Sequence, residues 1–254
     1  MATTSRTRVA ACAAALLVFA DGDGGAAAVR AAAPGPRVIR FAGHEWTVKA
    51  SGGEAIGPGP NHFSDRRRSV WVDAFGRLHL RIAKRHGRWW AAEVVSRTSF
   101  GHGTYRFVLD TPVDALPPSV VLGLFTWDDD PAFTHREIDV EFSRWNSPMN
   151  AVNVQYAVQP YERFGNLHTF TMPPTAPSTH EVTWRRDVIR FRSLAGFLAA
   201  PLVPADVIEE WTYAGTVPPA GAEQARINLW LFQGLPPADR RPVEVIVADF
   251  AFVP

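Results

Sequence analysis

From about Phe41 to the C-terminus, hydrophobic and polar residues mostly alternate with a period of two. Such alternation is typical of a strand with one buried face, and a short, continuous apolar run suits a strand that is buried on both faces. The pattern predicts strands over residues 70–72, 78–82, 105–109, 120–127, 153–158, 181–184, 188–191, 227–232 and 243–250. We therefore expect an all-β protein, built as a two-sheet antiparallel β-sandwich.

No long amphipathic helix interrupts the predicted strands. The segment from Pro201 to Tyr213 is compatible with a short helix over residues 206–211. We see no internal repeat, no low-complexity linker and no second domain. A single domain is therefore expected over residues 34–254.

The N-terminus has the pattern of a secretory signal peptide. Arg6 and Arg8 precede an apolar stretch over residues 9–20, which ends at the Asp- and Gly-rich segment 21–25. Such a stretch is too short to span a bilayer and matches the hydrophobic region of a signal. Small residues allow cleavage after Ala20 or within 26–33. We expect residues 1–33 to be signal peptide and linker, and the mature protein to be secreted (extracellular or periplasmic), without a membrane anchor.

The composition is that of an ordinary globular protein. The chain has 254 residues, of which 46% are hydrophobic and 20% charged, and a net charge of +1. A charge so close to zero argues against nucleic acid or an anionic membrane as the main partner, and we interpret Arg66–Arg68 as a solvated loop. The only cysteine, Cys12, lies in the signal segment, which excludes a disulfide and thiol chemistry from the mature protein. We expect a monomer.

Glu137, Asp139 and Glu141 occupy alternate positions in one predicted strand, with Ile138 and Val140 between them and Phe142 after them. In a strand, alternate side chains lie on one face, so the three acids would share a surface above an apolar underside. Neighbouring carboxylates repel one another and raise at least one pKa, which suits acid/base chemistry. The alternative is a solvated strand face on which the acids pair with Arg136 and Arg144.

These residues resemble the catalytic strand of glycoside hydrolase family 16, whose members are secreted, concanavalin A-like jelly rolls. The resemblance rests on the ranges 125–127, 137–142 and 154–156, with further similarity at Glu93, 101–105, 180–191 and 228–230. The two glutamates stand four residues apart, without an inserted residue. This spacing is similar to that of the mixed-linkage β-glucanases and the xyloglucan-acting members.

The resemblance implies that Glu137 is the nucleophile, Glu141 the general acid/base and Asp139 a residue that keeps their pKa values apart. Retaining glycoside hydrolysis needs two carboxyl groups about 5 Å apart. Four residues of strand span roughly 13 Å between Cα atoms. The glutamates can therefore converge only if the strand curves and their side chains lean inward.

Other residues are candidates for binding the substrate. Trp230 has two equal interpretations, a platform for a sugar ring or a core residue. The remaining candidates are Trp127, Asn228, His135, which stands where lichenase-like members carry a stacking tryptophan, and Glu93 and Arg97, which share one strand face. Ala157 and Gln159 replace an asparagine and a tyrosine of those enzymes, so the resemblance does not specify the sugar.

We expect no required cofactor. Asp128, Asp129 and Asp130 could bind Ca²⁺, but a solvated loop beside the cleft is the favoured interpretation. The expected function is retaining endo-hydrolysis of a β-linked polysaccharide, with β-glucan favoured. A transglycosylase and a non-catalytic carbohydrate-binding jelly roll remain as alternatives.

Overall fold

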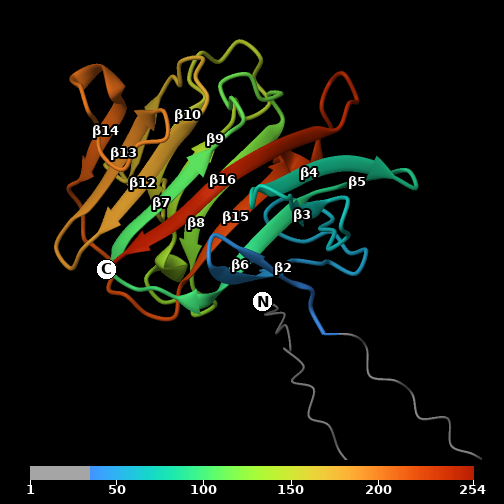
Figure 1. The fold of residues 1–254 in the computed structure, drawn as a ribbon, viewed down its shortest axis with the longest axis horizontal. Coiled ribbons are helices and arrows are strands. Elements are labelled where there is room, and N and C mark those ends of the chain that lie inside the picture. The colour runs from blue at the N-terminus through green and yellow to red at the C-terminus, as the bar shows by residue number, and fades with distance from the viewer. Residues whose placement is uncertain (1–34) are drawn as a thin grey trace, which may run out of the picture. The chain divides into compact units, whose positions relative to one another are not determined.

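The computed structural model describes residues 35–254, and strands make up nearly all of its regular structure (Figure 1). Cys12 and the expected signal segment 1–33 lie outside the described residues. The first antiparallel sheet has eight strands, which in spatial order are β1 (Val38–Phe41), β2 (His44–Val48), β6 (Ala92–Ser99), β15 (Gln224–Leu231), β8 (Val120–Trp127), β9 (Ile138–Phe142), β10 (Val154–Val158) and β11 (Leu167–Phe170).

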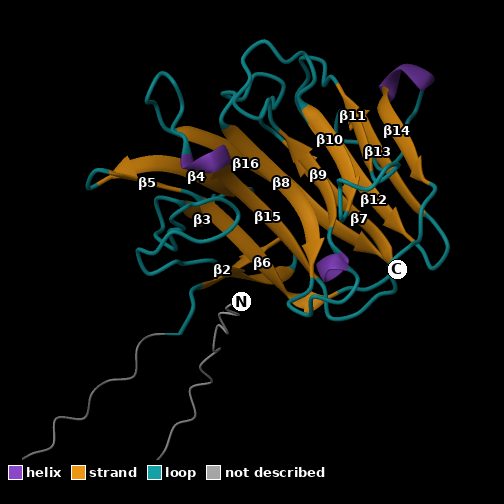
Figure 2. Ribbon diagram, turned by 180° about the vertical axis from the view of Figure 1, so that it is seen from behind, coloured by secondary structure: helices purple, strands orange, loops and turns teal. Residues whose placement is uncertain are grey.

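The second antiparallel sheet covers one face of the first (Figure 2). Its strands in spatial order are β14 (Val207–Tyr213), β13 (Ile189–Ala195), β12 (Ser178–Trp184), β7 (Gly103–Leu109), β16 (Val243–Val253), β4 (Leu78–Arg85) and β3 (Val70–Val72), with β5 (Arg88–Trp90) paired to β4. Within residues 35–254, three short 3-10 helices lie in the connections, η1 (Thr134–Arg136), η2 (Pro204–Asp206) and η3 (Phe232–Gly234). The expected two-sheet sandwich is confirmed.

One hydrophobic core fills the space between the sheets. Alternate residues of each strand supply it, and β9 contributes Ile138, Val140 and Phe142, each at most 1% exposed. Val182 and Phe107 lie in the same core from the second sheet. Because side chains alternate across a strand, burying these three β9 residues turns Glu137, Asp139 and Glu141 to the opposite face. The apolar underside predicted for the acids is therefore confirmed.

The predicted hairpin over residues 70–82 forms from β3 and β4, with Val70 opposite Leu80. Its turn is closed by Asp73, whose side chain accepts hydrogen bonds from the N–H groups of Phe75 and Arg77, both at 2.9 Å. Gly76 takes a φ of 81°, which a residue with a Cβ rarely adopts. The turn chemistry thus places β3 in register with β4.

The short helix considered for residues 206–211 does not form. A 3-10 turn at Pro204–Asp206 leads directly into strand β14, which pairs with β13 in the register Phe191↔Trp211. The Trp211 ring stacks on Phe191 at 5.2 Å between centroids and on His168 at 5.6 Å. Pairing with the sheet and aromatic packing outweigh the local helical tendency, because so short a helix is marginal in water.

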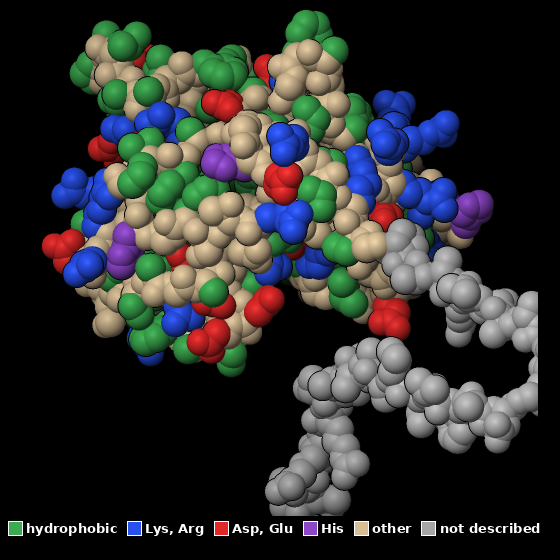
Figure 3. Space-filling view, turned by 60° about the horizontal axis from the view of Figure 1, so that its bottom comes forward, with side chains coloured by type: hydrophobic (Ala, Val, Ile, Leu, Met, Phe, Trp, Pro, Cys, Tyr) green, Lys and Arg blue, Asp and Glu red, His purple; other side chains and the backbone are tan. Residues whose placement is uncertain are grey.

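The surface of the molecule carries both signs of charge. In the face shown in Figure 3, basic and acidic side chains lie among uncharged residues. Arg66, Arg67 and Arg68 are exposed in a loop before β3, as expected. None of the helices among residues 35–254 has the length and hydrophobicity needed to cross a bilayer.

Candidate active site

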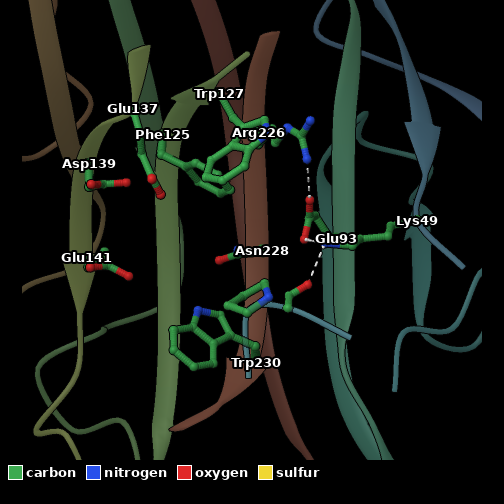
Figure 4. Close-up of a pocket in the computed structure, with 12 residues that line it drawn as sticks. Lys49, Glu93, Phe125, Trp127, Glu137, Asp139, Glu141, Arg226, Asn228 and Trp230 are labelled. Carbon is green, nitrogen blue, oxygen red and sulfur yellow. Dashed lines mark hydrogen bonds and ion pairs between the residues drawn. The ribbon is translucent and has the colours of Figure 1, made fainter. Parts of the chain in front are cut away.

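Strand β9 presents the three acids to a cleft that encloses about 280 Å³ on the outer face of the first sheet. Glu137, Asp139 and Glu141 all line it, and Figure 4 shows their carboxyl groups one after another along the strand, directed into the same space. Asp139 is 3% exposed, and the two glutamates are partly exposed. The shared face predicted from the alternation therefore belongs to a cleft.

A tight turn precedes β9 and positions Glu137 directly before its first residue. Residues 133–136 all have φ between 51° and 61°, the left-handed region that non-glycine residues rarely occupy. Thr126 Oγ1 donates to the Arg136 carbonyl at 2.7 Å, and the Asp128 N–H donates to the His135 carbonyl at 2.7 Å. Such strain persists only where the surroundings enforce it. The contacts with the end of β8 thus hold the turn that aims Glu137.

The three carboxyl groups raise one another's pKa values. Burial, with repulsion from Glu141 second, raises the pKa of Glu137 to about 8. Burial, with repulsion from Asp139 second, raises the pKa of Glu141 to about 8. Burial and repulsion from Glu137 also raise the pKa of Asp139 well above its usual value. The cluster therefore holds protons at neutral pH, and it cannot carry three negative charges at once.

Two glutamines, one in β10 and one directly after it, hydrogen-bond to these acids. Gln155 Nε2 donates to Glu141 Oε2 at 2.8 Å, from the position directly opposite in the β9–β10 pairing. Gln159 Nε2 donates to Asp139 Oδ2 at 2.9 Å. Because a donor stabilises the ionised carboxyl, each contact lowers the pKa of its acid and partly offsets burial. Neither glutamine was among the site residues expected from the sequence.

The two arginines that flank the motif do not pair with its acids. Arg136 donates to Asp128 at 3.0 Å and lies 3.6 Å from Asp130. Arg144 donates to the backbone carbonyl of Asn150 at 3.2 Å. The acids are thus neither neutralised by these arginines nor spread over an open surface, and the alternative of a solvated strand face is not supported.

Strand β15, separated from β9 by β8, contributes residues to the lining of the cleft. Its residues alternate, so that Ile227, Leu229 and Leu231 enter the core while Asn228 and Trp230 face the cleft. Asn228 is 2% exposed, and its Oδ1 atom has no hydrogen-bond partner. An added Cβ on Gly123 of β8 would lie 2.5 Å from that oxygen, so a glycine is required opposite it. The unpaired oxygen is available to a hydroxyl donor in the cleft.

Trp230 lines the cleft and also belongs to the packed interior. It is 8% exposed and packs with Trp145 and Phe232 in a small hydrophobic cluster, with ring centroids 6.5 Å apart in both pairs. Both interpretations of its sequence position therefore apply. Its edge on the cleft offers apolar surface to a sugar ring, and its other contacts hold it there.

A charged network lies across the cleft from the three acids. Glu93 is fully buried and accepts hydrogen bonds from Lys49 at 2.7 Å and from Arg226 at 3.3 Å (Figure 4). Arg226 also lies 3.3 Å from Asp129 and 5.7 Å from the Trp127 ring centroid. Its positive charge lowers the pKa of Glu137, against burial and Glu141. Glu93 and Trp127 were expected in the site, whereas Lys49 and Arg226 were not.

Two expected binding residues lie outside the cleft lining. Arg97 is exposed and pairs with Glu45 at 3.3 Å, so its expected place in the cleft is wrong. The β6–β15 register is irregular next to it, and Arg226 of β15 provides the positive charge beside Glu93 instead. His135 stacks on Trp127, with centroids 3.9 Å apart and planes within 10°, and so supports a cleft residue without lining the cleft itself.

The consecutive aspartates after β8 are held by protein groups. Asp128 pairs with Arg136 and accepts from the Ala222 N–H at 2.9 Å, while Asp130 accepts from the Ala132 N–H at 3.0 Å. Within the described part of the chain, no three His, Cys, Asp or Glu side chains gather in a way that would hold a metal ion. The interpretation as a solvated loop holds for Asp129 and Asp130, which are exposed, but not for Asp128, which is 4% exposed because it pairs with Arg136 and with backbone N–H groups.

The raised pKa of Glu137 predicts a pH-dependent gain in stability for Glu137→Gln. Because the folded protein binds this proton more tightly than the unfolded chain, the free energy of unfolding falls as the pH rises from about 4.5 to about 8. The variant lacks this titration. We expect it to be more stable than the parent by about 2 kcal/mol at pH 8 and nearly equal at pH 4.

Urea unfolding of both proteins at the two pH values measures this difference. Glu162→Gln, at an exposed loop position, serves as the control and should change stability little at either pH. A stability gain of equal size at pH 4 and pH 8 would contradict the assignment of a raised pKa to Glu137.

Comparison with known proteins supports the fold. No family model and no curated protein matches the chain. A structure described as a native glycosidic hydrolase has a TM-score of 0.59 at 18% identity, covering 86% of this chain and 97% of that one. The β-glucanase of Bacillus licheniformis has a TM-score of 0.59 at 15% identity, covering 82% and 92%. An immunostimulatory antigen and pseudo β-1,3-glucanase of Mycobacterium tuberculosis has a TM-score of 0.56 at 19% identity, covering 82% and 90%.

These similarities place the protein in a structural class. The chain has the two-sheet jelly-roll sandwich of the β-glucanase structures, over most of its described length. At 15–19% identity they show the fold alone, and one of the similar structures is described as a pseudo-glucanase. The activity must therefore be argued from the residues of the cleft.

Proposed function

We propose that the protein is a secreted retaining endo-β-glycosidase of glycoside hydrolase family 16, which hydrolyses internal linkages of a β-linked polysaccharide, with β-glucan favoured. The observation that carries the proposal is the set of three carboxyl groups with raised pKa values on the cleft face of β9. A pair of carboxyl groups with different protonation states is what retaining glycoside hydrolysis requires.

In the proposed reaction, Glu137 and Glu141 have different roles. The Glu137 carboxylate attacks the anomeric carbon while Glu141 donates its proton to the leaving oxygen. Water then enters, Glu141 removes a proton from it, and the ester bond between Glu137 and the sugar breaks. The pKa values of both glutamates are raised to about 8, so the pair retains protons at neutral pH. The hydrogen bond from Asp139 and the charge of Arg226 favour Glu137 as the ionised member.

A panel of β-linked polysaccharides, assayed for new reducing ends, tests this proposal. We expect internal cleavage of at least one β-glucan, with a rapid fall in solution viscosity. Products longer than the substrate, formed when an acceptor oligosaccharide is added, would favour the transglycosylase of the same fold. Binding without any cleavage across the panel would favour the non-catalytic alternative. One of the similar structures is described as a pseudo β-1,3-glucanase, which is the reason for testing this alternative.

The stereochemistry of the first product provides a separate prediction. A double displacement through Glu137 returns the β configuration, whereas a single displacement by water inverts it. Proton NMR of the anomeric signals during the first minutes of hydrolysis should show β product before mutarotation. An initial α product would exclude Glu137 as a covalent nucleophile.

A further inference from the structure

Gln159 forms two hydrogen bonds with the acidic residues, one from its backbone and one from its side chain. It directly follows β10, and its backbone N–H donates to the Glu137 carbonyl at 3.1 Å. Its side-chain Nε2 donates to Asp139 Oδ2 at 2.9 Å. Its side-chain Oε1 accepts from the Tyr161 backbone N–H at 2.9 Å. The side chain thus bridges a loop backbone and the central acid of the cluster.

The contact with Tyr161 decides which way the amide of Gln159 points. A backbone N–H can only donate, so the atom facing Tyr161 must be the amide oxygen. The NH₂ group must then face Asp139, where it can only donate. The carbonyl oxygen of a protonated carboxyl is a stronger acceptor than its hydroxyl oxygen, so the contact with this NH₂ donor favours Oδ2 as the acceptor and Oδ1 as the site of the proton.

This preference determines where Asp139 carries a proton. Its pKa is raised well above the usual value by burial and by Glu137, and the two residues share a hydrogen bond that raises the pKa of Asp139 and lowers that of Glu137. With Oδ2 committed to Gln159, the proton of Asp139 resides on its other oxygen. The Asp139 hydroxyl is then the donor in the hydrogen bond to Glu137, and this bond stabilises the ionised form of Glu137 and lowers its pKa against the effect of burial.

We propose that Gln159 is a positioning residue, which confines the Asp139 proton to Oδ1, so that Asp139 donates to Glu137 and favours the ionised form of Glu137 that attacks. The inference rests on the proposed function for the role of Glu137 as nucleophile. The contacts that carry it do not depend on that role.

Other charged groups around Asp139 do not replace this contact. On the neighbouring strands, β8 places the uncharged Phe125 opposite Asp139, and β10 places Ala157 there. The charged groups that line the same cleft are Glu137, Glu141, Glu93, Lys49 and Arg226. Glu93 and Lys49 hydrogen-bond to each other, and Arg226 acts on Glu137. The amide of Gln159 is therefore the group that donates to Asp139 in a fixed orientation.

Two substitutions of Gln159 distinguish an effect on the position of the Asp139 proton from an effect on side-chain packing. Gln159→Glu keeps the size and the acceptor for Tyr161, but its second oxygen accepts the Asp139 proton at neutral pH. Glu137 then loses its donor, and its pKa rises. Gln159→Met removes both contacts, so the Asp139 proton is free to occupy either oxygen, and the pKa of Glu137 should rise by less.

The matched control is Gln155→Met, at the same residue type within β10. Gln155 donates to Glu141 at 2.8 Å, so its loss should raise the pKa of Glu141 and move the alkaline limb of the pH–rate profile upward. The acidic limb, which reports Glu137, should stay in place. A general disturbance of the site would move both limbs in all three variants.

The test combines carboxyl ¹³C NMR titration with pH profiles of kcat and KM. For Gln159→Glu we expect the acidic limb to move up by about one pH unit, kcat at pH 6 to fall by up to about 10-fold and KM to stay within about threefold. The ¹³C titration should show the rise in the Glu137 pKa directly. An unchanged Glu137 pKa in both Gln159 variants, or a loss of stability with both limbs in place, would overturn the proposal. A parent protein without glycosidase activity would refute the proposed function instead, and the ¹³C titration would still decide the placement of the proton.

Discussion

Glu137→Gln should lower kcat by about four orders of magnitude or more on any polysaccharide that the parent cleaves. The amide keeps the shape of the side chain but has no negative charge with which to attack the anomeric carbon. Substrate affinity should change little, because the residues on the other side of the cleft, among them Asn228 and Trp230, are untouched. Steady-state kinetics, with a separate binding measurement by calorimetry, checks both parts.

One outcome would contradict the assignment of Glu137 as the nucleophile. A folded Glu137→Gln protein with near-normal turnover would exclude Glu137 from the chemistry. The control is Glu162→Gln, an exposed glutamate of the β10–β11 loop, which should retain parental kcat and KM. Unfolding curves ensure that activities of equally folded proteins are compared, and the variant is itself expected to be more stable than the parent at pH 8.

Glu141→Ala should lose about two to four orders of magnitude in turnover and recover much of it when azide is added. Recovery requires a substrate with an activated leaving group, which departs without a proton from Glu141. Azide then attacks the glycosyl enzyme without the help of a base, and the product is a β-glycosyl azide. Mass spectrometry identifies this product, and NMR of the anomeric proton gives its configuration.

The same anion should not rescue Glu141→Ala on a natural polysaccharide, because its poor leaving group still needs protonation in the first step. Asp139→Asn is the internal comparison. It should slow the reaction less than either glutamate variant and shift the acidic limb of the pH profile, since Asp139 tunes the pKa of Glu137. If azide restores nothing on the activated substrate, Glu141 is not the acid/base, and the two glutamates have exchanged roles.

The fold class was predictable because its signal is local. The alternation of acidic and apolar residues around β9 is visible in six consecutive residues, 137–142. The apolar run of β8 indicates that both faces of that strand are covered. The structure confirms each, with Ile138, Val140 and Phe142 in the core and Val120–Thr126 buried throughout. Because side chains alternate across a strand, burying Ile138, Val140 and Phe142 on one face places the three acids together on the opposite face.

The composition of the cleft was only partly predictable. Arg226 lies two residues before Asn228 on the same face of β15, but the predicted strand began at residue 227, so the place of Arg226 in the cleft was not predicted. Lys49 follows β2 and reaches Glu93 across 44 residues of sequence, which no local pattern predicts. Arg97 was expected beside Glu93 on the basis of spacing alone, but the side chain leans outward to Glu45.

The sequence by itself determined the strand periodicity, the chemistry of the three acids and their common face, because each depends on neighbours in the chain. The tertiary structure decided what surrounds that face, because strands distant in sequence become neighbours only when the sheets assemble. Strand β15 brought Asn228 beside Gly123, β10 brought Gln159 to Asp139, and β13 drew residues 207–213 into a strand. Burial and charge around the acids, and therefore their pKa values, come from that assembly, since both depend on which groups the folded chain places within a few ångströms.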